Sequence, residues 1–378
     1  MTELYIGLMS GTSLDGVDGV LVELATQAPG AAMPLVVLAH RHRAFDAVLA
    51  DELLALNTSG ADELHRAALA GNALARIYAG VVESLLDLSS APRGSVRAIG
   101  AHGQTVRHRP REFDATGYTL QLGNPALLAE LSGIDVVADL RSRDVAAGGL
   151  GAPLVPAFHR AIFAQAGKTI AVLNLGGMAN LTALHADGVT TGFDCGPGNA
   201  LMDHWCRQHT GRPFDAGGAW ASTGTVLAPL LATLLDEPFF RLIPPKSTGR
   251  DLFNAAWLAA RLPQLPSTDA ARPQDVQATL AELTATTCAQ AVREHAGDAQ
   301  ELLVCGGGAL NRHLLRRLEA QLQSMHVMTT DARGLPAMQV EACAFAWLAC
   351  AYCHRECANL PAVTGALGPR RLGALFPA

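Results

Sequence analysis

The sequence predicts an α/β protein built from two similar lobes. Its 378 residues exceed the usual size of a single hydrophobic core, so two domains are expected. Apolar runs of strand length alternate with segments of helical periodicity. The order strand, glycine turn, strand occurs at residues 4–24 and recurs at residues 169–185, which indicates two lobes of one design. We assign residues 1–138 plus 345–378 to the first lobe and residues 139–344 to the second.

Composition and charge exclude several classes of protein. Hydrophobic residues make up 49% of the chain and charged residues 16%, which predicts a folded rather than a disordered protein. The formal net charge of −6 argues against a nucleic-acid partner, because phosphate neutralisation needs clustered Lys and Arg. Residues 1–8 carry no positive leader pattern, and no apolar stretch reaches the length of a membrane span. We therefore expect a cytoplasmic protein with no membrane partner.

The cysteines fit that compartment, and one cluster of them allows a second interpretation. Most of the eight cysteines stand singly in apolar surroundings, where a cysteine is usually a small buried hydrophobe. Residues 350–354 match the Cys-x-x-Cys-His pattern of haem attachment, and Cys357 adds a possible metal ligand. Alternatively, Cys350, Cys353 and Cys357 share one face of an apolar helix that begins near Gln339. We favour the helix interpretation over haem attachment, because haem attachment has no obvious route without an export signal.

The first lobe opens with two strands, at residues 4–9 and 16–24, joined by a Gly/Ser/Thr/Asp turn. This is a hairpin and not the strand-to-helix connection of a P-loop, whose Gly-x-x-x-x-Gly-Lys-Ser/Thr string is missing from the sequence. The remaining predicted elements are helices at 46–56 and 61–88, a strand at 96–101, a helix with Pro125 in its first turn, a strand at 134–138, a charged glycine-rich loop at 141–151 and a helix at 153–166.

The second lobe begins with strands at residues 169–175 and 179–185, and a third strand is expected at residues 188–193. Residues 302–310 read as a strand followed by three glycines, and a helix is expected at residues 311–323. Residues 259–273 are the most linker-like stretch of the chain, and we interpret them as a surface loop within this lobe.

The turn between the first two strands is a candidate phosphate site. Consecutive backbone amides in such a turn can point inward and bind an anion. Asp15 and Asp18 would repel a phosphate directly, but they can act through water on a Mg²⁺ ion bound to it. The alternative is an ordinary hairpin turn with solvated aspartates. The turn comprises Gly11, Thr12, Ser13, Leu14, Asp15, Gly16, Val17 and Asp18.

Two further glycine groups are candidates for nucleotide binding. Gly176 and Gly177 follow the first strand of the second lobe, at the place where the phosphate turn follows the first strand of the first lobe. Gly306, Gly307 and Gly308 follow a strand and precede a helix, so they offer backbone amides and a flat surface to a nucleotide. Either group could instead be a plain tight turn.

Asp194 is the strongest candidate for acid–base catalysis. It falls where an apolar strand ends and a Gly-Pro-Gly turn leads into a helix, so rigid backbone would fix a carboxylate that faces a cleft. The alternative is a helix cap, in which Asp194 would accept hydrogen bonds from amides near Asn199 or Ala200.

Several other polar residues follow predicted strands, where open α/β sheets bind ligands. They are candidates for the substrate site: His102, Gln104, Thr105, Arg141 and Arg143. The two arginines could hold a substrate carboxylate, or could pair with Asp139 and Asp144 instead. The loop at residues 246–250 is either a lid or a solvated turn. Glu341 lies at the start of an apolar helix, where a carboxylate usually does no more than interact favourably with the helix dipole.

Taken together, these motifs resemble the anhydro-N-acetylmuramic acid kinase family, and the resemblance covers nearly the whole chain. Two departures from the family pattern are small: Cys195 stands where Thr is more usual, and Asp251 where Glu is common. The motifs that carry the resemblance are residues 7–18, 102–105, 139–149, 192–203, 245–254, 305–311 and 340–349.

The resemblance implies a two-lobed actin-like ATPase fold of the ribonuclease H-like class, with ATP in a cleft between the lobes. It implies hydrolytic opening of the 1,6-anhydro ring of anhydro-N-acetylmuramic acid with phosphorylation of O6, at the expense of ATP and with Mg²⁺. By position, residues 11–18 would line the phosphates, Asp194 would be the catalytic base, and Glu341 a second active-site carboxylate. The family also implies a homodimer. The alternatives are an actin-like phosphatase or ATPase, or an Hsp70-like nucleotide switch.

Overall fold

The computed structural model describes the chain except Met1, Thr12 and residues 26–32, 250–251 and 263–271. The described chain forms two compact units. Unit 1 comprises Met1–Ile162 and Gln339–Ala378, and unit 2 comprises Phe163–Met338. Asp251 and most of the predicted linker at residues 259–273 lie outside the described residues.

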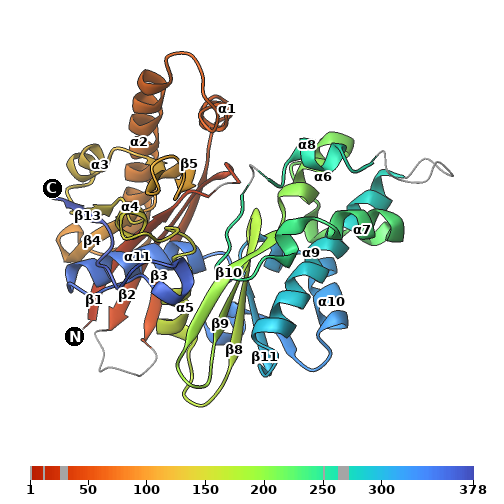
Figure 1. The fold of residues 1–378 in the computed structure, drawn as a ribbon. Coiled ribbons are helices and arrows are strands. Elements are labelled where there is room, and N and C mark those ends of the chain that lie inside the picture. The colour runs from red at the N-terminus through yellow and green to blue at the C-terminus, as the bar shows by residue number, and fades with distance from the viewer. Residues whose placement is uncertain (1, 12, 26–32, 250–251, 263–271) are drawn as a thin grey trace. The chain divides into compact units, whose positions relative to one another are not determined.

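Unit 1 is built on a mixed sheet of six strands (Figure 1). β1 pairs antiparallel with β2, and β2 with β3, while β1 and β4, and β4 and β7, are parallel. The last strand, β13, adds an antiparallel edge to β7. The order across the sheet is β13 (Ala374–Phe376), β7 (Val136–Ala138), β4 (Val96–Ala101), β1 (Thr2–Met9), β2 (Gly16–Ala25) and β3 (Leu35–Ala44).

Unit 2 repeats that topology in a sheet of five strands. β8 and β9, and β9 and β10, are antiparallel, while β8 and β11, and β11 and β12, are parallel. The repeat predicted from the two glycine hairpins is therefore a repeat of a whole sheet, and the mixed α/β class is confirmed. The order is β10 (Thr190–Pro197), β9 (Met178–Leu184), β8 (Ile170–Leu175), β11 (Glu301–Cys305) and β12 (His326–Thr329).

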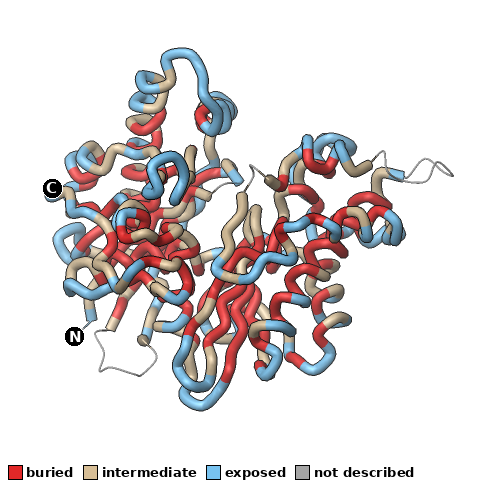
Figure 2. The backbone as a smooth tube through the Cα atoms, in the orientation of Figure 1, coloured by how far each residue is buried: buried red, intermediate tan, exposed pale blue. Residues whose placement is uncertain are grey.

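Apart from the edge strands β3, β12 and β13, the strands of both sheets are buried over half or more of their length, and helices pack against them (Figure 2). In unit 1 the helices are α1 (Ala47–Ala55), α2 (Glu63–Ser89), α3 (Pro125–Ser132), α4 (Ser142–Ala146), α5 (Val155–Phe163, whose last residue belongs to unit 2), α11 (Val340–Cys353) and α12 (Pro361–Thr364), with a 3₁₀ turn at Arg93–Ser95. In unit 2 they are α6 (Ala200–Thr210), α7 (Ala228–Leu235), α8 (Ala255–Ala259), α9 (Pro273–His295) and α10 (Arg312–Gln321), with 3₁₀ turns at Ala216–Gly218, Ala221–Thr223, Pro238–Arg241, Gly307–Leu310 and Thr330–Arg333.

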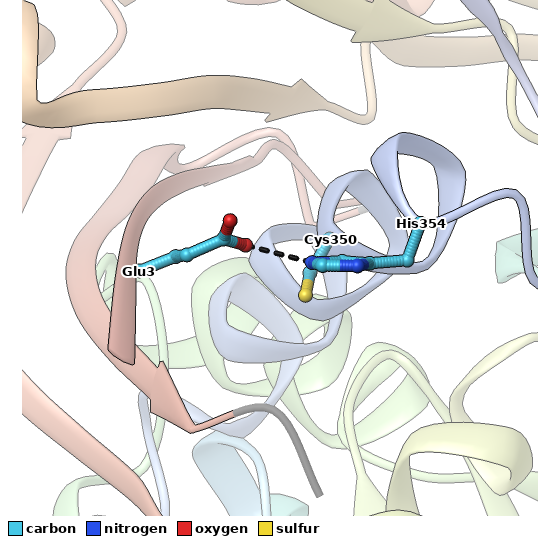
Figure 3. A group of neighbouring side chains, drawn as sticks. All are labelled: Glu3, Cys350 and His354. Atoms are coloured by element: carbon cyan, nitrogen blue, oxygen red, sulfur yellow. Dashed lines mark hydrogen bonds and ion pairs between the residues drawn. The ribbon is translucent and has the colours of Figure 1, made fainter. Parts of the chain in front are cut away.

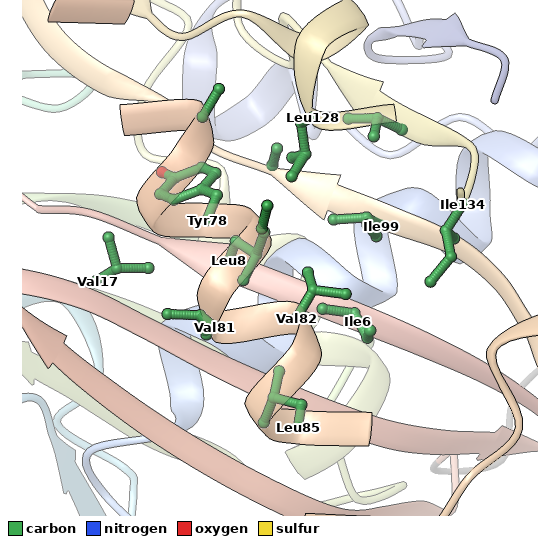
Figure 4. Close-up of a cluster of buried hydrophobic side chains, with 14 of the residues drawn as sticks. Ile6, Leu8, Val17, Tyr78, Val81, Val82, Leu85, Ile99, Leu128 and Ile134 are labelled. Carbon is green, nitrogen blue, oxygen red and sulfur yellow. The ribbon is translucent and has the colours of Figure 1, made fainter. Parts of the chain in front are cut away.

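The core of unit 1 lies between its sheet and α2. Ile6 and Leu8 of β1 pack against Val81, Val82 and Leu85 of α2 (Figure 4). Successive side chains of a strand point to opposite faces, so the residues between them turn toward the other side of the sheet. There α11 contacts β1, β2 and β4.

Several predicted helix boundaries are confirmed, because the capping residues accept hydrogen bonds from amides only a few residues away in the chain. The carboxylate of Asp46 accepts a hydrogen bond of 2.8 Å from the amide of Leu49 at the start of α1. Asn124 does the same for Leu127 at 3.0 Å, and Pro125 occupies the first turn of α3.

Other expectations were wrong. The loop predicted at residues 141–151 contains the short helix α4. The hairpin of β5 (Gln104–Pro110) and β6 (Gly117–Leu122) was not foreseen. β5 is largely polar, and the alternation of Tyr118, Leu120 and Leu122 with polar residues in β6 was overlooked. α11 ends at Cys353, so the exposed Cys357 lies beyond the helix on which it was placed.

Two glycines allow α11 to lie directly on the sheet. A Cβ atom on Gly7 would stand 2.7 Å from the backbone nitrogen of Ala346, and one on Gly100 would stand 2.7 Å from the carbonyl carbon of Phe345. Both distances are below the 3.0 Å that real Cβ atoms essentially never cross. Since the obstructing atoms belong to helix backbone, they cannot turn aside as a side chain would.

We therefore expect Gly100→Ala to destabilise the protein by at least about 2 kcal/mol, the cost of overpacking a filled interior. A loss of that size lowers the melting temperature by roughly 4–8 °C in a domain of this length. Thermal melts followed by circular dichroism measure it. Gly94→Ala is the control, because a Cβ atom at exposed Gly94 meets nothing within 4 Å. Equal melting temperatures for the two variants would contradict the proposed contact.

Candidate active site

The turn after β1 is anchored to the rest of unit 1 by Ser10. The Ser10 hydroxyl is buried, lies 2.9 Å from the Tyr78 hydroxyl of α2, and donates a hydrogen bond of 3.0 Å to the carbonyl of Gly103. The burial of the Tyr78 hydroxyl raises its pKa, so it stays a neutral partner. These bonds join the end of β1 to the turn that follows β4.

Beyond Ser10 the predicted phosphate turn is open to solvent and then enters the core. Ser13 and Asp15 are exposed, and the Ser13 hydroxyl donates to the Asp15 carboxylate at 2.6 Å. Leu14 has a φ of 59°, in the left-handed region, which reverses the chain direction. Val17 is fully buried, so it can contribute only backbone to a ligand. Thr12 lies outside the described residues.

The remaining residues of that turn are held by β3. A Cβ atom on Gly16 would collide with the backbone carbonyl of Arg43, so this position requires glycine for a close approach of two strands. Asp18 is partly buried, and its Oδ1 lies 3.1 Å from His40 Nε2 and 3.2 Å from His42 Nδ1. Asp15 and Asp18 thus differ in surroundings, since only Asp18 has histidine partners among the contacts described here.

Three predicted substrate residues meet at the ends of β4 and β7. His102 Nδ1 lies 3.0 Å from the carbonyl of Ser10, and Arg141 donates to His102 Nε2 at 2.9 Å from Nη2 and 3.2 Å from Nε. Gln104 donates from Nε2 to the carbonyl of Gly11 at 3.0 Å. Arg141 also donates to the carbonyl of Gly151 at 2.8 Å. The structure therefore brings His102, Gln104 and Arg141 together with the phosphate turn.

The hydrogen bonds of His102 define its protonation. The carbonyl of Ser10 can only accept and the guanidinium of Arg141 can only donate, so Nδ1 carries the proton and Nε2 is unprotonated. Burial, together with the positive charge of Arg141, lowers the pKa of His102 to about 3. His102 is thus a neutral hydrogen-bonding group rather than a cation.

A pocket of about 260 Å³ opens beside His102 in unit 1. Gln121 lines it and donates from Nε2 to Thr119 at 2.8 Å and to the predicted residue Thr105 at 3.2 Å. Its buried Oε1, like the Oε1 of Gln104, has no hydrogen-bond partner within the described chain. Such unpaired buried acceptors are rare and point to a missing ligand or water. The polar lining of the pocket comprises Tyr78, His102, Thr119, Gln121, Asn124, Asp139 and Ser142.

Arg143 and Asp144 lie in α4 but face different surroundings. Arg143 is exposed, whereas the Asp144 carboxylate is fully buried and accepts from the amide of Gly151, the amide group of Asn359 and the hydroxyl of Thr364. Asp144 thereby fixes the loop after α4, a structural role that sequence reasoning missed because two of its partners are more than 200 residues away.

Glu341 lies in the first turn of α11 and is partly buried. It precedes Phe345 by four residues, so both lie on one side of the helix. The Phe345 ring stands 4.7 Å from the His102 ring, centroid to centroid. The first turns of α11 therefore belong to the same region of unit 1 as His102 and the phosphate turn.

In unit 2 the two predicted glycine groups meet around Asn199. The carbonyl of Gly176 accepts from the amide of Asn199 at 2.8 Å, and the carbonyl of Gly177 accepts from the amide of Gly198 at 3.0 Å. Asn199 also donates from Nδ2 to the carbonyl of Leu175 at 2.9 Å. A Cβ atom on Gly308 would lie 2.5 Å from Leu175 Cβ and 3.2 Å from Asn199 Oδ1. The Gly176–Gly177 turn and the Gly306 to Gly308 segment thus share neighbours.

Asp194 lies inside β10, not at its end, because the strand continues to Pro197 through a bulge. Its Oδ2 accepts a bond of 2.7 Å from the Ser247 hydroxyl and one of 2.9 Å from the amide of Thr248. Asn199 caps the following helix by position, so the alternative of Asp194 as a helix cap was wrong. Ser247 and Thr248, which orient this carboxylate, belong to the loop predicted as a lid or a solvated turn, and residue 250 of that loop lies outside the described residues.

A row of polar residues crosses the sheet beside Asp194. Asp194 pairs in register with Asn180, Asn180 with Asn174, and Asn174 with Cys305, so all four side chains lie on one face. Asn180 Oδ1 and Thr248 Oγ1 are buried and lack a hydrogen-bond partner within the described chain. Ligand or water is expected at these atoms.

Two further groups near Asp194, the Cys195 thiol and the Lys246 ammonium, have shifted pKa values. Cys195 is buried against the Cys288 thiol, and this contact together with burial raises the pKa of Cys195. Lys246 lies over the Phe239 ring with Nζ 4.9 Å from its centroid, and burial lowers the pKa of its ammonium. These groups pack the base of the Asp194 site.

Comparison with known proteins gives one consistent result. The family model described as anhydro-N-acetylmuramic acid kinase matches residues 3–378. An anhydro-N-acetylmuramic acid kinase of Variovorax paradoxus (strain S110) is 61% identical over 381 residues, which cover 100% of this chain and 99% of that protein. The one of Bordetella pertussis (strain Tohama I) is 59% identical over 376 residues, covering 99% and 96%.

Two solved structures resemble the fold more distantly. The activator of the 2-hydroxyisocaproyl-CoA dehydratase from Clostridium difficile with bound ADPNP is 13% identical, with a TM-score of 0.46, covering 91% of this chain and 92% of that one. A ROK family glucokinase from Streptomyces griseus in complex with glucose and AMPPNP is 12% identical, with a TM-score of 0.37, covering 91% and 98%. In the described part of this chain, no helix combines the length and hydrophobicity that a membrane crossing requires.

The depressed pKa of His102 has a testable consequence. Its pKa of about 3 lies below the 6.5 of a free histidine, so the unfolded chain takes up the proton first on acidification. The stabilisation from neutral His102 is complete above about pH 6.5 and is lost as the pH falls toward 3. We expect the ring resonances of His102, assigned by their loss in His102→Gln, to keep the shifts of neutral imidazole at pH 5. A titration midpoint near pH 6.5 would contradict the buried, Arg141-bonded state.

Proposed function

The chain belongs to the anhydro-N-acetylmuramic acid kinase family, and we propose that Asp194 is the base of its reaction. The enzyme uses ATP to phosphorylate anhydro-N-acetylmuramic acid on O6 and opens the 1,6-anhydro ring by hydrolysis, giving N-acetylmuramic acid 6-phosphate and ADP. Identity of 54–61% to proteins of that name, over nearly the whole chain, is the observation that carries this function. It favours the kinase over the phosphatase and nucleotide-switch alternatives.

Asp194 has the properties that the hydrolytic half of the reaction needs. Asp194 is 8% exposed, and the two donors on Oδ2 hold the carboxylate in one orientation. A base so placed can take a proton from a water that attacks C1, while positive charge develops on the sugar ring. The O6 atom that leaves C1 then accepts the γ-phosphoryl group, so no free alkoxide has to form.

Backbone amides support the proposed binding of the ATP phosphates. Ser13 and Asp15 are exposed in the turn that is held at Ser10 and Gly16. Gly176 and Gly177 are partly exposed and Gly307 is exposed, so these glycines can offer backbone amides to a ligand. We propose that all three groups contact the nucleotide. The position of ATP between lobes and the homodimer stay predictions from the family, as does the cytoplasmic location.

The carboxylates of Asp15 and Asp18 are our proposed partners of Mg²⁺. Carboxylate oxygen is the donor that Mg²⁺ prefers, and both residues flank the phosphate turn. Asp15 is exposed and its carboxylate accepts a hydrogen bond from the Ser13 hydroxyl, so it suits a water-mediated role. Asp18 would have to act while His40 and His42 lie beside it. When bound, Mg²⁺ neutralises phosphate charge, and the carboxylates position it.

Arg141 or Arg143 is our proposed contact for the lactyl carboxylate of the substrate. Arg141 is held at His102 and Gly151 next to the pocket, which fixes its guanidinium in advance of binding. Arg143 is exposed and lies two residues further along the chain, in α4. His102, Gln104 and Thr105 are proposed to contact the sugar. His102 and Gln121 line the pocket, where the unpaired Oε1 of Gln121 can accept a hydrogen bond from a hydroxyl group.

Asp194→Asn should fold and bind ATP but lose turnover by at least about 10²-fold, because the amide cannot accept the proton of the attacking water. The assay is incubation with ATP, Mg²⁺ and anhydro-N-acetylmuramic acid in ¹⁸O-water, followed by mass spectrometry. The unmodified protein should give a 6-phosphorylated product with ¹⁸O at C1.

Asp187→Asn is the matched control, because Asp187 is exposed on the turn before β10 and its replacement should leave turnover unchanged. If Asp194→Asn retained near-normal turnover, Asp194 would not be the base. If the unmodified protein gave no phosphorylated sugar at all, the kinase function itself would be refuted.

Replacing both Arg141 and Arg143 by Ala should raise the KM for the sugar by about tenfold or more, since a hydrogen bond to a charged group is worth roughly 1.5–3 kcal/mol. The KM for ATP should change little. Arg160→Ala, at an exposed position of α5, is the control for loss of positive charge. An unchanged KM for the sugar in the double variant would refute the carboxylate contact.

A further inference from the structure

Three side chains with metal-binding donors meet at one edge of unit 1. The carboxylate of Glu3, the thiol of Cys350 and the imidazole of His354 offer donor atoms that all lie within 4.8 Å of one another (Figure 3). Glu3 comes from the start of β1, while Cys350 and His354 lie one helical turn apart at the end of α11. They form the only group of three or more such donors at this spacing within the described residues.

The donor set fits a zinc ion. Thiolate, imidazole and carboxylate are the ligands that Zn²⁺ takes, at about 2.0–2.3 Å each, so tetrahedral ligands stand about 3.3–3.6 Å apart. Glu3 Oε2 and His354 Nε2 now share a hydrogen bond of 2.7 Å, and Cys350 lies within the 4.8 Å limit. Small side-chain movements bring all three to coordinating distance. Glu3 and His354 are about one-third exposed and can make them, while Cys350 is 6% exposed and acts as a fixed anchor.

The surroundings of the cluster support a built site. The hydroxyl of buried Tyr5 donates a bond of 2.7 Å to Glu3 Oε2, which orients the carboxylate as partners of metal ligands commonly do. Partial burial of Glu3 acts to raise its pKa, but the hydrogen bonds from His354 and Tyr5 outweigh that effect and lower the pKa of the carboxyl below its usual value. Both features leave Glu3 ready to coordinate a cation.

The cluster is separate from the candidate active site. Glu3 and Ser10 stand at opposite ends of β1, seven residues or about 23 Å apart along the strand. Cys350 and Glu341 are nine residues apart on α11, or about 13 Å. A soft thiolate selects Zn²⁺ over the hard Mg²⁺ of a kinase. Metal bound here would cross-link β1 to α11 without touching the reacting groups.

We propose that Glu3, Cys350 and His354 bind one Zn²⁺ ion, with water as the fourth ligand. On binding, the Cys350 thiol releases its proton to solvent and the sulfur donates to the metal. The Glu3–His354 hydrogen bond is exchanged for two bonds to the ion. The alternative is that these residues form an ordinary hydrogen-bonded pair beside a buried thiol.

Cobalt serves as the probe, because tetrahedral Co²⁺ with a thiolate ligand absorbs in the near ultraviolet and the visible. The full chain, reduced and held in Mg²⁺, is titrated with Co²⁺ and then with Zn²⁺. We expect one equivalent of Co²⁺ to give thiolate-to-cobalt absorption that Zn²⁺ displaces. We also expect Zn²⁺ to raise the melting temperature, since the ion binds the folded chain.

Variants test the ligand set. Cys350→Ser should lose the thiolate absorption, and His354→Gln, which changes a partly exposed group and should not disturb folding, should lose binding of the equivalent. Cys357→Ser is the matched control, because Cys357 is exposed, lies beyond the helix and is outside the cluster. Tyr5→Phe should keep the absorption but weaken the affinity about 10- to 100-fold. Absence of the absorption in the unmodified chain, or its persistence in both Cys350→Ser and His354→Gln, would overturn the proposal.

Discussion

The contact of α11 with bare strand backbone is the constraint on which the organisation of unit 1 depends. At Gly7 and Gly100 the helix lies so near to β1 and β4 that no side chain fits between them. This contact fixes the position of α11 along the strands of the sheet. It therefore sets where the Glu341 turn stands relative to His102, and where Cys350 stands relative to Glu3. A helix seated on longer side chains would be free to shift, because such side chains can adopt other rotamers.

Both units have the same sheet topology, and the candidate binding turns follow equivalent strands in each. In unit 1 the turn after β1 meets the turn after β4 through Ser10 and Gly103. In unit 2 the turn after β8 and the segment after β11 have Asn199 and Leu175 as common neighbours. Since β1 and β4, like β8 and β11, are adjacent and parallel, their carboxyl ends lie at one edge of the sheet, where loops can surround a ligand.

Features that arise from local sequence could be predicted, and features that arise from distant contacts could not. Strands, glycine turns and capped helices follow from periodicity and from neighbours a few residues away, as Asp46 and Pro125 illustrate. Asp194 could be singled out as a candidate, but its partners Ser247 and Thr248 are more than 50 residues away in the chain. The pairing of Asp18 with His40 and His42 likewise depends on strand register, which the apolar pattern of β3 does not reveal.

The glycine at position 7 changes how variation among related sequences should be interpreted. Gly7 begins the motif at residues 7–18, and on sequence grounds alone its invariance in an alignment would count as evidence for phosphate binding. In the structure, Gly7 allows α11 to pack closely on β1. A side chain at this position would collide with the backbone of α11, on the far side of the sheet from Ile6 and Leu8. Selection at positions 7 and 100 would then act on folding, and a catalytically dead relative would be under the same pressure to keep both glycines. Within one such motif, some residues can be invariant because they take part in the chemistry and others because they are needed for packing.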